Sequence, residues 1–476
     1  MGIKDNAKTS LASQVKTNQG KDAISPALTL QMAVAAALVN DPWLLGNRYS
    51  QQAIESLSVA AGTLPDPKMS LGFSNLPSDT FDFAQEGMTQ FKVGVSQVLP
   101  RGDSLAIKQK QLRLSASQYP FQQQDRQAKV AVTVTHLWLD AYRAQKSIAL
   151  IEHDRSLFDQ LAQVAEASYS SAVGRTSQQD VIRAQLELVR LDDRLTVLNE
   201  HKNMAMQRLN EWLSDYFLSS KFSADKNSSH ANNLSSLQTS LAANMNLTVA
   251  ADLPEIKLLN PHLYTNALQT SPQVLYEYFS EHAAVKNLQQ KLQASNSSIA
   301  LAKQNYKPQW ALNASYGYRD QDPMGNDRSD LFSMGVSFDL PLFTSNRQDQ
   351  QLQAAVAKTE AVRSEKWLLV RKLMASFETA RAKLFSLRQR RDLYRSQLLP
   401  QMREQAQASL SAYTSVNGDF AEVVRARIAE LNANIDALAI DVDLQKSRAQ
   451  LNYFFMQEAK QIIALRSINA ATGETL

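Results

Sequence analysis

Four short stretches of the chain alternate large apolar residues with small or polar ones. In the last of them Phe332, Met334, Val336, Phe338 and Leu340 alternate with serine, glycine and aspartate. A period of two over nine or ten residues is typical of a β-strand with two unlike faces. Loops rich in Asp, Pro, Gly and Asn join the stretches in pairs. The pattern therefore predicts two β-hairpins, with strands at 67–76, 91–99, 309–319 and 331–340.

A second hydrophobic pattern follows each hairpin. In it, apolar residues recur every three or four positions and so form a seam along one face of a helix. Its first part runs through Val130, Val134, Leu137, Ala141, Ala144, Ile148 and Ile151. This spacing predicts long helices that pair as antiparallel coiled coils. We expect them at 104–173, 177–213, 346–415 and 419–466, with Pro120 as a candidate break. The longest would extend about 100 Å at 1.5 Å per residue.

The two patterns together occur twice in the chain. Residues 91–100 and 332–341 are identical at six of ten positions, and their final prolines lie 241 residues apart. We therefore expect two repeats of one unit, at 27–213 and 256–466. The polar segment 214–255 would join them, with a disordered segment at 1–26 and a loose tail at 467–476.

Shorter helical patterns precede each hairpin. In the first repeat they occupy 28–39 and 43–63, which end before prolines. Their counterparts are 263–270 and 273–306, where the second repeat has eleven additional residues. Because eleven residues make about three helical turns, we expect the second helix to lengthen without rotating its apolar face.

Composition excludes several classes of function. The net charge is +4, with both signs mixed along the helical patterns, which favours solvated helix faces over nucleic-acid binding. The absence of cysteine excludes disulfides, thiolate metal sites and a lipid-modified N-terminal cysteine. No stretch approaches eighteen consecutive apolar residues, and residues 1–25 lack the apolar core of a signal peptide. No phosphate loop, catalytic triad or paired-carboxylate motif is present, so we expect neither an enzyme nor a bound cofactor.

The strands fit two interpretations. A small polar face opposite a large apolar face suits a membrane barrel with lipid outside and a wet lumen. The same alternation also suits a half-buried hairpin in a soluble protein. The long helices favour the first interpretation, because one globule cannot bury four such seams.

The order of helix, hairpin, long helix, glycine-containing turn and return helix resembles the TolC family of outer-membrane efflux proteins. The matching residues include Asn40-Asp-Pro42, the Val173-Gly174 turn with Asp180-Val181, and the Gly-Val-Ser…Leu-Pro strand ends. Shorter matches, such as Leu64-Pro-Asp-Pro67 and Pro100-Arg-Gly-Asp103, are similar to the CusC/CzcC-like heavy-metal branch.

The resemblance implies a mainly α-helical homotrimer with a membrane β-barrel portion. Each chain would give four strands to one 12-stranded barrel, and the helices would form a periplasmic tunnel. Elementary geometry agrees, because four strands cannot close a barrel and open sheet edges are not tolerated in lipid.

The resemblance also implies functional positions. A periplasmic adaptor would dock at the helical tip, at Val173, Gly174, Arg175 and Gly418. The tunnel entrance would be gated by Asp180, Arg183, Glu422 and Arg425. Arg425 stands where the family often has an acidic residue, so rings of opposite sign could latch the closed state. Simpler interpretations remain: the glycines suit helix C-caps, and Glu422 with Arg425 suits an exposed helix ion pair. Pro100 and Pro341 mark the strand-to-helix corners, where Arg101-Gly-Asp103 is interpreted as part of the corner.

Metal-binding residues give a weak signal. The six histidines are dispersed without a paired metal spacing, so we expect packing or surface roles. Met69, Met88, Met324 and Met334 lie in or near the strands and loops. Their thioethers suit Cu(I), although methionine on a lipid-facing strand is ordinary apolar surface.

The expected function is a passive outer-membrane exit duct, with no chemistry of its own. The resemblance implies a periplasmic adaptor (membrane fusion) protein and an inner-membrane pump of the RND or another type as partners. It also implies outer-membrane lipid around the strands and export of heavy-metal cations such as copper or silver, or of drugs. The alternatives are the outer-membrane component of a type I protein secretion system and a soluble structural coiled-coil protein.

Overall fold

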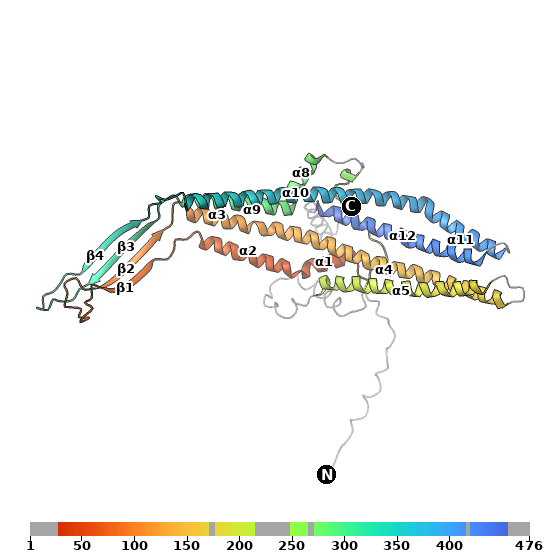
Figure 1. The fold of residues 1–476 in the computed structure, drawn as a ribbon, viewed down its shortest axis with the longest axis horizontal. Helices are drawn as coiled ribbons and strands as arrows, with labels where there is room; N and C mark the ends of the chain where they lie inside the picture. The colour runs from red at the N-terminus through yellow and green to blue at the C-terminus, as the bar shows by residue number, and fades with distance from the viewer. Residues whose placement is uncertain (1–26, 171–176, 215–247, 265–270, 416–418, 456–476) are drawn as a thin grey trace, which may run out of the picture.

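The computed structural model describes residues 27–170, 177–214, 248–264, 271–415 and 419–455. These residues form an elongated body with a small sheet at one end and long helices running to the other (Figure 1). The expected segments 1–26, most of 214–255 and 467–476, together with residues 456–466 of the last expected helix, lie outside the described residues.

The element order repeats, as the sequence predicts. The first repeat contains α1 Leu30–Asn40, α2 Pro42–Ala60, β1 Lys68–Ser74, β2 Gln90–Leu99, α3 Ser104–Ala116, α4 Gln118–Ser170 and α5 Gln178–Leu213. The second contains the 3₁₀ turn η1 Pro261–Tyr264, α8 Pro272–Ser280, α9 Ala283–Gln304, β3 Trp310–Tyr318, β4 Leu331–Phe338, α10 Gln348–Leu393, the π turn η2 Tyr394–Leu398, α11 Leu399–Thr414 and α12 Phe420–Tyr453.

The two hairpins form one antiparallel sheet with strand order β1-β2-β3-β4. The register aligns the apolar positions of all four strands, because Met69 pairs with Val95, Val95 with Ala314, and Ala314 with Met334. Side chains alternate between faces with a period of two. One face is therefore apolar except for Gln97 of β2, which lies opposite Leu312. Its side chains on β1 and β4 are exposed: Met69, Leu71, Phe73, Phe332, Met334, Val336 and Phe338.

Two expected helices are interrupted. The helix expected over 104–173 divides at Ser117 into α3 and α4, and Pro120 lies in the first turn of α4. Proline is tolerated there because a first-turn residue has no intrahelical partner for its N–H. The helix expected over 346–415 contains a π turn, in which the Leu399 N–H bonds to the Tyr394 carbonyl. This turn precedes Pro400, which cannot donate a backbone hydrogen bond.

The prediction of a continuous helix over 273–306 is wrong. It divides into α8 and α9 at Glu281 and His282, and His282 caps α9 by accepting a hydrogen bond from the Ala284 N–H (3.2 Å). The additional residues of the second repeat therefore do not lengthen one helix. They form α8, which projects from the side of the body beside α10 (Figure 1). Of the helix expected over 263–270, Leu263 and Tyr264 belong to η1 and the remainder lies outside the described residues.

Three apolar clusters hold the helices together along the body. The first joins α1, α4 and α5 around Trp138, whose indole N–H donates to the Leu28 carbonyl (2.9 Å). The second packs Phe279, Phe377 and Phe454 between α8, α10 and α12. The third lies nearer the far end and joins α4, α5 and α12. The seams are therefore buried in separate packed layers along the length of the helices.

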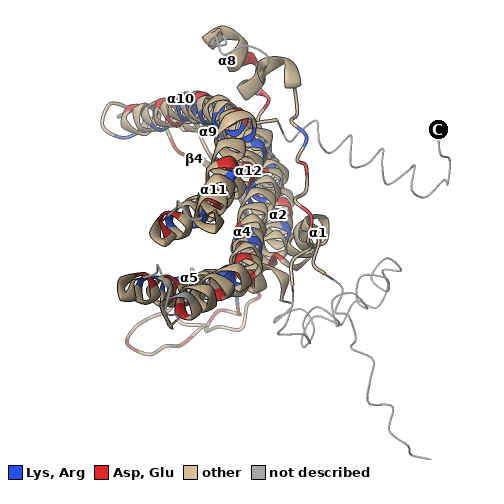
Figure 2. Cartoon of the chain, turned by 90° about the vertical axis from the view of Figure 1, so that its right-hand side faces the viewer, with Lys and Arg blue, Asp and Glu red and all other residues tan. Residues whose placement is uncertain are grey.

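Charged residues of both signs are mixed along the helices (Figure 2). Within the described part of the chain, no helix combines the length and apolar character required to cross a membrane.

Candidate tip, helix latch and strand-to-helix corners

The start of α5 carries the first pair of sequence-predicted gate residues. The Asp180 carboxylate accepts hydrogen bonds from the backbone N–H (3.0 Å) and the hydroxyl (2.7 Å) of Ser177. It also forms an ion pair with Arg183 at 3.9 Å. A carboxylate in the first turn satisfies free N–H groups and complements the helix dipole. The local role of Asp180 is therefore to fix where the return helix begins.

The start of α12 carries the second pair. The Asp419 carboxylate caps this helix by accepting from the Ala421 N–H (3.0 Å). Arg425 donates to the Glu422 carboxylate at 2.6 Å, and both side chains are exposed. Exposed pairs of this kind contribute at most about 1 kcal/mol within one chain. Any larger effect requires a neighbouring copy.

The fold brings both helix starts to the end of the body opposite the sheet (Figure 1). The third apolar cluster connects them, with Ala184 of α5 and Phe420 and Val424 of α12. Each ion pair nevertheless stays within its own helix in the described chain. The expected docking residues Val173, Gly174, Arg175 and Gly418 lie outside the described residues.

Ion pairs and a hydrogen bond connect neighbouring helices between this tip and the sheet. Arg155 of α4 pairs with Asp192 of α5 at 3.0 Å, and Arg395 of η2 pairs with Asp441 of α12 at 2.8 Å. Arg194 of α5 donates to the Asn432 side chain of α12, which connects the two repeats directly. No sequence pattern predicts these pairs, because the two partners of each lie on different helices.

The two strand-to-helix corners meet at the base of the sheet. Arg101, which follows Pro100, pairs with Asp339 and donates to the Lys307 carbonyl (2.7 Å). Asp339, two residues before Pro341, also accepts from the Gln309 N–H (2.6 Å). The antiparallel register supplies this proximity, because Leu99 lies opposite Trp310 and Trp310 lies opposite Phe338.

The corners differ in length and exposure. Helix α3 begins at Ser104, four residues after Pro100, with Gly102 between them at φ +45°. Helix α10 begins only at Gln348, seven residues after Pro341. The longer corner leaves Leu342 and Phe343 largely exposed, at 72% and 89%. Among the described residues of one chain, nothing covers its apolar tip.

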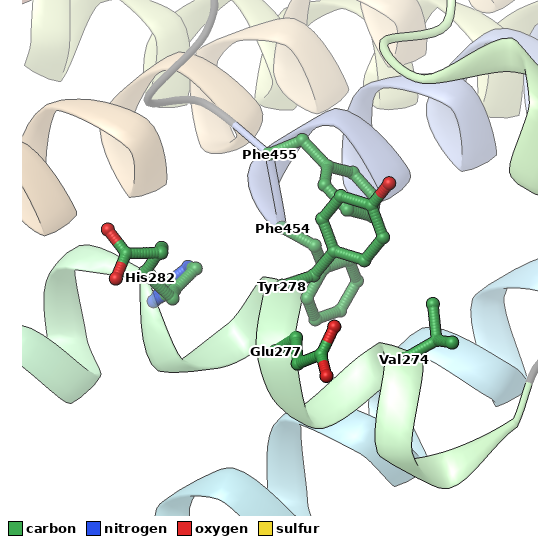
Figure 3. Close-up of a pocket in the computed structure, with 7 residues that line it drawn as sticks. Val274, Glu277, Tyr278, His282, Phe454 and Phe455 are labelled. Atoms are coloured by element: carbon green, nitrogen blue, oxygen red, sulfur yellow. The ribbon is translucent and has the colours of Figure 1, made fainter.

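A cavity of about 500 Å³ lies between α8 and the end of α12 (Figure 3). Phe454, Phe455 and Tyr278 form its aromatic side, and Glu277, Glu281 and His282 form its polar side. His282 stacks edge-on against Tyr453, whose hydroxyl donates to the Asp125 carboxylate (2.8 Å). Burial and the Asp125 carboxylate both raise the pKa of Tyr453, so this hydroxyl remains protonated. The ring contact and the hydrogen bond thus connect the start of α9 to α12, and α12 to α4.

Burial lowers the pKa of His282 below its ordinary value of 6.5, although the nearby Asp125 carboxylate opposes the shift. The folded chain keeps the ring neutral, whereas the unfolded chain takes up a proton as the pH falls through about 6.5. This contribution to stability is complete above about pH 6.5 and is lost as the pH falls toward the lower folded-state pKa.

We therefore expect a lower thermal midpoint at pH 5.5 than at pH 7.5, and a smaller difference in the H282N variant. Asparagine retains the helix cap but does not titrate. Burial also lowers the pKa of His136. The H136N variant of the otherwise wild-type chain is therefore the matched second variant. Identical pH dependence in the wild type and both variants would contradict the assignment.

Comparisons with known proteins agree with this geometry. Residues 274–453 match the family model described as outer membrane efflux protein. No curated protein matches the sequence. Among solved structures, the outer-membrane channel OprN is similar with a TM-score of 0.68 and 15% identity, over 89% of this chain and 89% of that chain. CusC is similar with a TM-score of 0.67 and 14% identity, over 93% and 95%. The CmeC outer membrane channel of Campylobacter jejuni has a TM-score of 0.68 and 12% identity, over 90% and 85%.

The fold is thus that of TolC-like outer membrane channels. The chain has this fold across its described residues and carries the sequence pattern of the outer membrane efflux protein family over its second repeat. The resemblance inferred from the sequence is confirmed at this level.

Proposed function

We propose that the chain is one third of a passive exit duct, in which three copies form a channel through the outer membrane and a helical tunnel below it. The observation that carries this proposal is the apolar face shared by all four strands, on a sheet with two open edges. Such a face is the surface that lipid requires, and no part of the described helices covers it in one chain.

The open edges explain the number of chains. Among the described strands, β1 pairs only with β2 and β4 only with β3, so each outer strand presents a row of unpaired backbone groups. Unpaired backbone groups are costly in lipid, and four strands are too few to close on themselves. Three copies joined edge to edge would give one closed 12-stranded barrel, which satisfies both constraints.

The helices give the proposed tunnel its gate. In a trimer, the starts of α5 and α12 from three chains surround one axis at the tip. Glu422 and Arg425 then form neighbouring rings of opposite sign, so that ion pairs between chains would hold the closed state. Asp180 and Arg183 would support the same ring from α5. Opening requires the paired helices to move apart and break these contacts.

The proposed partners follow from this arrangement. A periplasmic adaptor would contact the tip around Val173, Gly174, Arg175 and Gly418, and an inner-membrane pump of the RND or another type would supply the energy. Heavy-metal cations and drugs, the cargoes that the sequence resemblance implies, are both candidate cargoes. In the described chain, no three His, Asp or Glu residues gather as a metal site. A type I protein secretion duct is the alternative with the same fold.

The decisive experiment measures the mass of the purified full-length chain and its conductance in a planar bilayer. We expect a trimer that requires detergent and conducts ions when inserted. A monomer that is soluble without detergent and has no conductance would overturn the proposal.

The latch gives a separate prediction. In R425E, carboxylates at positions 422 and 425 of three chains repel one another, and we expect channel conductance to rise several-fold. Swapping the charges (E422R with R425E) retains an i, i+3 pair of opposite sign and is the matched control, with conductance near the wild-type value. Unchanged conductance in R425E would contradict the latch.

A further inference from the structure

Glycine hollows the polar face of the sheet, opposite the apolar one. In the register, Gly94 of β2 lies between Ser70 of β1 and Ser315 of β3, and Ser315 lies opposite Ser333 of β4. A Cβ atom at position 94 would lie 2.6 Å from the Ser70 hydroxyl, so a larger residue would fill this space. A hollow of about 340 Å³ results, with Ser70, Lys92, Ser96, Asn313, Ser315 and Ser333 as its polar lining.

Within the bounds of the four strands, lysine supplies the only charge on this face. The four strands contain two charged residues, Lys68 and Lys92, and the alternation of side chains places both on the polar face with the serines. The register neighbours of Lys92 are Gly72 and Gly317, which have no side chain to cover its exposed stem.

The two carboxylates that flank β4 already have partners. Asp339, just after β4, pairs with Arg101 at the base of the sheet. Asp330, just before β4, accepts hydrogen bonds from the Tyr316 hydroxyl and the Arg319 N–H. Asp66 lies two residues before β1, Asp103 lies at the base of the sheet, and the remaining carboxylates of this end lie in the loops 77–89 and 319–330. The serine-lined hollow therefore has a positive charge without a carboxylate on any of its strands.

We propose that this hollow binds anions and gives the duct a preference for anionic cargo. The inference rests on the proposed exit-duct function, because that function turns the polar face toward the lumen. The lysine ammonium, the serine hydroxyls and the Asn313 amide are all hydrogen-bond donors. Together they suit the oxygen atoms of phosphate, sulfonate or carboxylate groups, with Lys92 as the charged contact.

Trimerisation strengthens the effect. Three copies place three Lys92 and three Lys68 side chains on one enclosed wall. A lumen lined by one sign of charge concentrates ions of the opposite sign. Free metal cations would have to pass six ammonium groups. The inference therefore predicts anionic cargo, whereas the resemblance implies metal cations.

The test is calorimetric titration of the detergent-solubilised full-length protein with tripolyphosphate at low ionic strength. We expect saturable binding that weakens about tenfold or more in K92Q, because a charge-assisted contact is lost. K92R should bind within about threefold of the wild type, since the positive charge remains. K202Q, on α5 and away from the sheet, is the matched control for the loss of one lysine and should bind like the wild type.

The outcomes separate the inference from the proposed function. A conducting trimer that does not bind tripolyphosphate, or that binds it equally well in K92Q, would overturn the anion site and leave the duct intact. A detergent-free monomer without conductance would overturn the duct, and with it the cargo preference. Block of the current by tripolyphosphate, lost in K92Q, would support both.

Discussion

Replacing Arg126 with alanine is expected to destabilise the folded chain by about 3 kcal/mol, because it leaves a buried carboxylate without its partner. Arg126 of α4 pairs with Asp41 at 2.8 Å, and the Asp41 side chain is only 3% exposed. Without Arg126, this carboxylate stays buried with no countercharge. The guanidinium also lies over Trp43 (5.7 Å) and Trp212 (5.4 Å), so the variant also loses two cation–π contacts.

The measurement is the thermal midpoint of the purified protein in detergent. R190A is the matched control: Arg190 is 64% exposed in its i, i+3 pair with Glu187, and its loss should change stability by less than about 0.5 kcal/mol. D41N combined with R126M should recover part of the loss, because asparagine still caps α2 and no buried charge remains. Equal midpoints for R126A and R190A would contradict the argument.

Placing arginine at Ala314 is expected to prevent stable insertion into the outer membrane. Ala314 lies in the middle of the apolar face, opposite Val95 and Met334 in the register. An arginine on a lipid-facing strand costs about 2–4 kcal/mol near the centre of the bilayer. Three copies would each bear this cost in the proposed barrel. Membrane fractionation should show most of the A314R protein outside the outer membrane.

Ser315 is the matched control, because it is the next residue of β3 and points to the opposite face. S315R introduces the same side chain into the proposed lumen, where water solvates the charge, and we expect normal insertion. Equal insertion of A314R and S315R would contradict the assignment of the two faces.

The sequence predicted the hairpins well because strand alternation is a local property. β3 and β4 begin within one residue of the expected positions, and β2 matches its expected range within one residue at the start. The return helix expected over 177–213 is α5, which begins at Gln178 and ends at Leu213. Each of these elements carries its own periodicity and its own stop signal.

The helix interruptions were less predictable. Pro120 is visible in the sequence, yet the break falls at Ser117, because proline fits the first turn of a new helix. The break at His282 has no proline or glycine to mark it. It depends on Phe279, which packs against Phe377 and Phe454 in the second cluster and thereby turns α8 out of line with α9.

The candidate sites include pairs that are local in sequence, which could be predicted, and pairs between distant residues, which could not. Asp180 and Glu422 lie in the first turns of their helices, where a carboxylate complements the helix dipole. Each pairs with an arginine three residues later in its own helix. The Arg101–Asp339 pair joins residues from different repeats, and the Asp41–Arg126 pair joins α4 to the start of α2. Neither pair has a periodicity that could reveal it.

The sequence by itself determined the four strands and the long seams, because each depends on residues close together in the chain. It also determined the double repeat and the likeness to TolC-like channels, because both follow from comparing such local patterns. Only the tertiary structure decided which residues of the two repeats meet. It showed that the polar faces of all four strands align into a hollow around Gly94, with Lys92 as its charge. The physical reason is the strand register: the pairing of β2 with β3 joins two hairpins that are far apart in sequence, and backbone hydrogen bonds fix it residue by residue.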